Sequence, residues 1–150
     1  MFASNVKLKS LRRKNIMIEI QNLLDKTLPF VTTLLKDYGE FYPLASAVNL
    51  NREVEQVLLE EDEENDFPTS ATVIGELKKA LSWQKDEFIA IAIFYDVALK
   101  EEQTDAIAIF VEHKEENQAF TIYYPYKMID SEIVFSESWK VENEMEIFVN

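Results

Sequence analysis

Apolar residues recur at helical spacing in two segments of the chain. The first shows them every three or four residues and predicts an amphipathic helix over about residues 15–37. Gly39 follows it as a helix stop, because glycine readily adopts the left-handed backbone of a helix end. A second apolar stripe predicts a helix over about 71–84, with Thr69 or Ser70 as its N-cap.

The other apolar segments have the character of strands. Residues 88–97 are apolar on both faces, which indicates a central strand covered on both sides or lying at an oligomer interface. Two longer strands are predicted over 105–113 and over 119–126, the second ending at Pro125. Shorter strands are predicted over 41–48, 53–60 and 133–135, and an arm or short strand within 139–150.

The links between the strands are short, and this determines the predicted fold. Short links force neighbouring strands to run antiparallel. We therefore expect an α+β fold: a single antiparallel sheet of about five to six strands with two main helices on one face, in the order α-β-β-α-β-β-β. This order resembles the roadblock and longin type of domain, whose members dimerise or act as scaffolds.

The charge divides the chain into two parts. Residues 1–16 contain five basic and no acidic residues, whereas residues 17–150 contain ten basic and all twenty-eight acidic residues, a net charge of −18. We expect a basic, disordered arm over 1–15 and a single acidic domain over 16–150. Two other interpretations of the arm stay open: an amphipathic segment that touches membrane, or an upstream start with Met17 as the functional one.

Several kinds of chemistry conflict with the composition. The absence of cysteine excludes disulfides and thiolate metal sites, and two distant glycines cannot build a phosphate-binding loop. We expect no cofactor and no metal site, since a single histidine cannot supply the usual zinc ligands. The negative charge argues against nucleic acid and anionic membrane as partners. The absence of cysteine and of any long apolar stretch favours a cytoplasmic location.

The single histidine, His113, offers the best case for catalysis. It could serve as a general base oriented by Asp96 or Asp105, which lie near facing ends of two neighbouring predicted strands. The alternative is a structural histidine that closes the end of its strand with local hydrogen bonds.

Candidate partner-binding residues lie in two places. Residues 60–66 include no apolar side chain and predict a solvated loop, whose carboxylates would attract a basic protein. Tyrosine is a frequent anchor at interfaces, although core packing is the alternative for the two rings in the last long strand. The residues predicted to bind a partner are Glu61, Asp62, Glu63, Glu64, Asp66, Tyr124 and Tyr126.

Five short motifs between Ile18 and Phe135 are similar to those of an uncharacterised family of small acidic bacterial proteins. They are Phe41-Tyr42-Pro43-Leu44-Ala45, Ala92-Ile93-Phe94-Tyr95-Asp96-Val97, Thr104-Asp105-Ala106-Ile107, Val111-Glu112-His113 and Tyr124-Pro125-Tyr126-Lys127. Members of such families sit beside polymorphic toxins and look like their immunity proteins. The resemblance implies a non-enzymatic inhibitor of a basic, cognate toxin, and it assigns no catalytic residue. The alternatives are a homodimeric, roadblock-like regulatory scaffold and, third, a small enzyme that uses His113.

Overall fold

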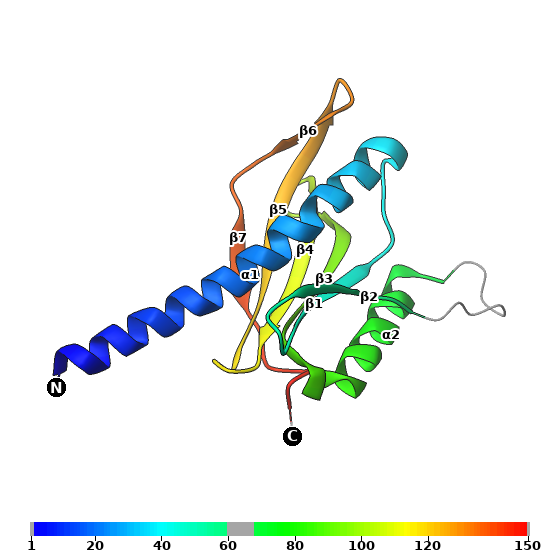
Figure 1. Ribbon diagram of the computed structural model, residues 1–150. Coiled ribbons are helices and arrows are strands. Elements are labelled where there is room, and N and C mark those ends of the chain that lie inside the picture. Colours follow the sequence, from blue (N-terminus) through cyan, green and yellow to red (C-terminus); the bar gives the residue numbers. More distant parts are fainter. Residues whose placement is uncertain (1, 60–67, 150) are drawn as a thin grey trace.

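The computed structural model describes residues 2–59 and 68–149, and the side chains of 18–59 and 68–149. Within these residues it has two α-helices, one short 3-10 helix and one seven-stranded sheet (Figure 1). The elements are α1 (Phe2–Tyr38), β1 (Leu44–Asn49), β2 (Val54–Val57), α2 (Ser70–Trp83), η1 (Lys85–Glu87), β3 (Phe88–Leu99), β4 (Thr104–His113), β5 (Gln118–Ile129), β6 (Glu132–Phe135) and β7 (Trp139–Glu142).

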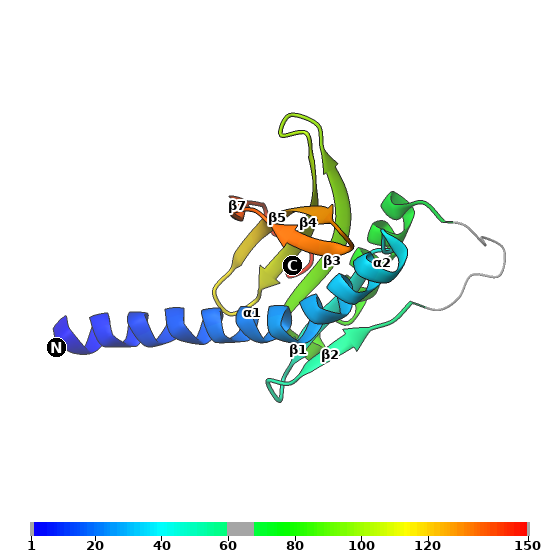
Figure 2. The same ribbon diagram turned by 90° about the horizontal axis from the view of Figure 1, so that it is seen from above.

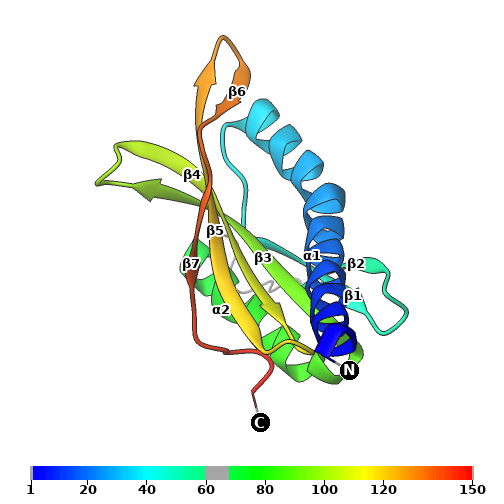
Figure 3. The ribbon, with the colours of Figure 1, turned by 90° about the vertical axis from the view of Figure 1, so that its left-hand side faces the viewer.

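All strand pairs are antiparallel, and the strands follow the order β2-β1-β3-β4-β5-β6. The last two strands share one edge of β5, because β6 pairs with residues 126–129 and β7 with residues 120–123. The predicted α+β class, the single antiparallel sheet and the order α-β-β-α-β-β-β are therefore confirmed. The sheet curls, and the β3–β4 and β5–β6 hairpins extend from it (Figures 2 and 3).

The two helices lie on opposite faces of the sheet, so the prediction that both cover one face is wrong. Side chains alternate between the faces of a strand, and β1 shows the result. Ser46 faces α1, where its hydroxyl lies 2.9 Å from that of Thr27. Its neighbours Ala45 and Ala47 pack in the cluster that contains the buried α2 residue Leu77. A sheet whose central strands are apolar on both faces needs this cover on both sides.

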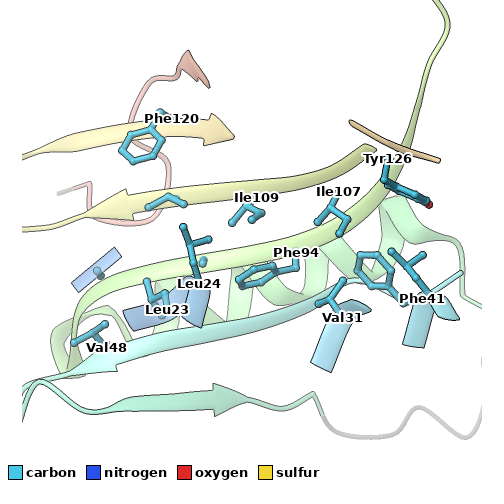
Figure 4. Packing of buried hydrophobic residues seen from close by; sticks show 14 of the residues in the cluster. Leu23, Leu24, Val31, Phe41, Val48, Phe94, Ile107, Ile109, Phe120 and Tyr126 are labelled. Carbon is cyan, nitrogen blue, oxygen red and sulfur yellow. The ribbon is translucent and has the colours of Figure 1, made fainter. Parts of the chain in front are cut away.

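The core accordingly consists of two clusters separated by the sheet. The first lies between α1 and the sheet, where Leu23, Leu24 and Val31 meet Phe94 and Ile109 (Figure 4). The second lies between α2 and the sheet and also contains Ile147 from the C-terminal segment. The burial predicted for the strand over 88–97 is confirmed for its first seven residues, which are all buried.

The first helix is longer than the sequence predicts. It begins at Phe2 rather than near residue 15, and its N-terminal part extends beyond the sheet (Figures 1 and 2). The backbone is thus helical where we expected a disordered arm. The side chains of residues 1–17 lie outside the description, so the division into an arm and a domain stays a prediction. The helix ends as predicted at Gly39, which has φ +76° and whose N–H donates to the Leu35 carbonyl at 2.8 Å.

Pro125 does not end its strand as predicted, because β5 continues to Ile129. In a strand, the N–H and the C=O of one residue point to the same edge. The Pro125 carbonyl accepts a hydrogen bond from the Ser136 N–H at 2.9 Å, on the edge of β5 that also carries β6 and β7. The missing N–H therefore falls in the gap between β6 and β7, where no ladder bond is lost.

Candidate functional site

Of the residues predicted to bind a partner, the structure describes only Tyr124 and Tyr126. Glu61, Asp62, Glu63, Glu64 and Asp66 lie outside the described residues. Tyr124 is half-buried and lines a groove beside α1.

Tyr126 is buried in the core between α1 and the sheet, with 4% of its surface exposed. Its burial leaves almost no surface with which a partner could make contact.

The Tyr126 hydroxyl has a specific partner inside the protein. It donates a hydrogen bond to Asp96 Oδ1 at 2.8 Å. Burial raises the pKa of the Asp96 carboxyl, and the nearby charges of Asp105 and Glu40 raise it further, whereas the bond from Tyr126 lowers it. Burial and the carboxylate of Asp96 also raise the pKa of the Tyr126 hydroxyl, which keeps it a donor at neutral pH.

His113 lies far from this pair, so the predicted catalytic arrangement is wrong. It ends β4 and is opposite Ala90, near the start of β3, whereas Asp96 is opposite Ile107 toward the other end of the same hairpin. Its ring contacts a residue remote in sequence: Nε2 lies 2.7 Å from Glu19 Oε2 of α1. The alternative of purely local hydrogen bonds is therefore wrong as well.

Glu19 also joins His113 to Arg52, which donates a hydrogen bond to the Glu19 carboxylate. Arg52 belongs to the β1–β2 turn and has φ +65°. The turn is organised by Asn49, whose side-chain oxygen accepts the N–H groups of residues 51 and 53. Arg52 also reaches Glu115 of the β4–β5 turn at 3.4 Å. The cluster thus fastens α1 to two turns of the sheet.

The surroundings of His113 are closed to a substrate. The residue is 1% exposed, Nε2 contacts Glu19, and Nδ1 is buried without a hydrogen-bond partner among the described residues. A general base must reach the proton that it removes. In this arrangement the ring contributes to the attachment of α1.

The adjacent residue, Glu112, makes a contact that sequence reasoning missed. It is completely buried and faces the opposite side of the sheet, since neighbouring side chains of a strand alternate. Its carboxylate accepts the N–H groups of Glu146 at 2.8 Å, Ile147 at 2.9 Å and Phe148 at 3.1 Å. Consecutive N–H groups of this kind form a nest that stabilises an anion. The signal available in the sequence was a charged residue directly after the apolar run 106–111, within the predicted strand over 105–113.

Glu112 thereby holds the C-terminal segment over the second core cluster, where Ile147 is buried. The flanks of the segment are held by lysines: Lys78 pairs with Glu146 at 2.9 Å, and Lys114 lies over the Phe148 ring at 5.6 Å.

A groove of about 610 Å³ runs along α1. Its walls come from α1 on one side and from β5, β6 and the link to β7 on the other. The two aromatic rings in it, Tyr124 and Phe135, meet edge to face with centroids 6.3 Å apart.

The surface of the described residues is dominated by carboxylates. Every acidic side chain whose exposure is described is exposed, except Glu19, Asp96, Glu112 and Glu116. Five carboxylates form ion pairs with lysine or arginine within this part of the chain: Glu19, Glu76, Glu115, Glu132 and Glu146. Most exposed carboxylates therefore face solvent without a basic partner among the described residues.

Within residues 2–59 and 68–149, no group of three or more His, Asp or Glu side chains is placed to hold a metal ion. In the same part of the chain, neither α1 nor α2 is long and apolar enough to cross a membrane.

Comparisons of the chain with protein-family models, with curated proteins and with solved structures give no match. The similarity to immunity proteins seen in the short motifs therefore stays a prediction.

Replacing Asp96 with Asn should raise the free energy of unfolding at neutral pH. Asn keeps an oxygen for the Tyr126 hydroxyl and removes the half-buried charge. Because the folded-state pKa of Asp96 lies above its unfolded value, ionised Asp96 costs stability at neutral pH, and this cost fades as the pH falls through the folded-state pKa. The advantage of the variant, measured by urea unfolding, should disappear in acid. Glu102→Gln, at an exposed turn, is the control, and a less stable Asp96→Asn at neutral pH would contradict the assignment.

Replacing Glu112 with Gln should lower the free energy of unfolding by roughly 2–4 kcal/mol, because an amide NH₂ then faces buried N–H groups that lose their acceptor. Thermal and urea unfolding measure the loss, and backbone NMR shifts of residues 146–148 show whether the segment detaches. Glu116→Gln, in the nearby β4–β5 turn, should change stability by less than about 0.5 kcal/mol. Equal effects of the two variants would show that the Glu112 contact contributes little.

Proposed function

We propose that this chain is a protein-binding domain that acts without catalysis, as an immunity-type inhibitor of a basic toxin. The observation that carries the proposal is the excess of exposed carboxylates over basic partners on the described surface. A surface of this sign attracts a basic protein from a distance and accelerates its capture. Carboxylates on the inhibitor would occupy the sites where a basic toxin binds phosphate.

The enclosed position of His113 supports a binding role rather than a catalytic one. Both ring nitrogens are buried, and the contact with Glu19 leaves no approach for a substrate in this arrangement. An enzyme that uses His113 is therefore the third-ranked function.

A dimeric regulatory scaffold is the second candidate, and one observation favours it. The outer edge strands carry exposed apolar side chains, among them Val134 in β6 and Trp139 and Val141 in β7. Exposed apolar edges are templates for pairing with another chain. An interface of this kind would depend little on salt.

The test of the inhibitor proposal is the association rate with a basic partner, found by screening basic proteins of the same genome. Exposed charges are screened beyond roughly 8–10 Å at physiological ionic strength. We expect the association rate to fall about tenfold or more between low and physiological salt, because steering contributes most of the rate.

Two matched variants would locate the surface. One replaces Glu61, Asp62, Glu63 and Glu64 with Ser in the segment between β2 and α2. The other replaces Asp130, Glu137, Glu142 and Glu144 with Ser near the opposite edge of the sheet. Both change the net charge equally, so a larger fall in rate for the first set identifies its segment as the contact.

If the association rate changes neither with salt nor with either set of substitutions, charge-driven inhibition is rejected. Loss of association by Trp139→Ser or Val141→Ser alone, with no salt dependence, would instead support the scaffold.

A further inference from the structure

The N-terminal part of α1 is a basic helical segment that extends away from an acidic domain. The segment includes the five basic residues at 7–14 and no acidic residue, and α1 has no acidic residue in its first turn. Glu19 is the first α1 side chain described as buried. The N-terminal part of α1 continues past the sheet (Figures 1 and 2). At 1.5 Å per residue, residues 2–17 form a rod of about 24 Å.

The charge of this segment is not neutralised within it, because it has five basic residues and no acidic one. The segment continues a helix that Glu19 fastens to the sheet, so it cannot fold back onto its own domain while α1 stays unbroken. An acidic surface on another molecule would attract it.

The groove beside α1 provides a matching surface. Its α1 wall runs from Gln21 to Thr32, about 17 Å at 1.5 Å per residue, and includes the apolar residues Leu24 and Leu28. Asp25 lines the groove, and the exposed Glu137 stands between two lining serines of the β6–β7 link.

We propose that this groove receives the segment 2–17 of a second copy of the chain. The charges are complementary, +5 on residues 1–16 against −18 on residues 17–150. The segment, about 24 Å long, is long enough to cover the whole α1 wall of about 17 Å. Its sequence also contains the apolar residues Phe2, Val6, Leu8 and Leu11, which suit an apolar wall.

The exchange is reciprocal in a dimer with two-fold symmetry. The same segment and the same groove are used on both copies, so the contact is closed and does not continue into a filament. The first helices of the two copies then run antiparallel, which places the basic end of each beside the groove of the other. This association is independent of the proposed capture of a toxin.

The experiment is a charge exchange, followed by sedimentation velocity of the full chain at low and high salt. The wild type should dimerise at micromolar concentration in low salt and dissociate as salt rises. Arg12→Glu with Arg13→Glu should weaken the dimer at least about tenfold, and so should Asp25→Lys with Glu137→Lys. All four substitutions together should restore the dimer, because the basic residues of the segment and the acidic residues of the groove are then exchanged.

The control is Glu101→Lys with Glu102→Lys, which makes the same charge change at the exposed β3–β4 turn and should leave the dimer intact. Thermal unfolding of each variant shows that it is folded, and rescue by the fourfold variant cannot arise from misfolding. A wild type that stays monomeric in low salt would overturn the proposal. So would a dimer that tolerates the arm substitutions, a failed rescue, or a monomer whose segment binds anionic vesicles.

Discussion

The structure depends on the double-sided burial of β3 and β4. Ala92 and Phe94 face the cluster under α1, whereas Ile91 and Ile93 face the cluster under α2. A strand pair of this kind exposes apolar surface unless both faces are covered, and each fully buried Ile or Phe side chain contributes about 1.5–3 kcal/mol. The helices must therefore lie on opposite faces, and the C-terminal segment completes the cover on the side of α2.

Two adjacent residues at the end of β4 attach α1 and the C-terminal segment to the sheet. His113 faces α1 and contacts Glu19, while Glu112 faces the other side and binds the N–H groups of residues 146–148. Strand alternation alone sends the two side chains to opposite faces. Breaking either contact would leave a buried polar group without its partner, so each contact holds its segment in one position. His113 and Glu112 therefore attach α1 and the C-terminal segment to the sheet. The exposed carboxylates and the groove beside α1 are left as the surfaces for partners.

Much of this fold could be predicted from local patterns. The faces that the helices cover, and the contacts that attach α1 and the C-terminal segment to the sheet, could not. The period of the apolar residues and the short links predict the helices, the long strands and their antiparallel order. Periodicity does not show which face each helix covers, and this is why the predicted one-sided arrangement was wrong. The contact between Glu19 and His113 joins residues 94 apart, and that of Glu112 joins residues up to 36 apart. Such pairs follow from the three-dimensional path of the chain. The acidic segment at 61–66 stays a prediction, and Tyr126 shows that a tyrosine can be read as an interface anchor and still be buried.

The most direct test of this account is amide hydrogen exchange of the wild type and of Glu19→Gln, followed by mass spectrometry. In the wild type, the amides of β3 and β4 should exchange slowest, because both of their faces are covered. In the variant, exchange should accelerate in residues 18–35 of α1, whereas residues 143–149 stay protected by Glu112. Equal acceleration in both segments, or slowest exchange in the β5–β6 hairpin, would contradict the claim that the two covers are fastened separately to one central strand pair.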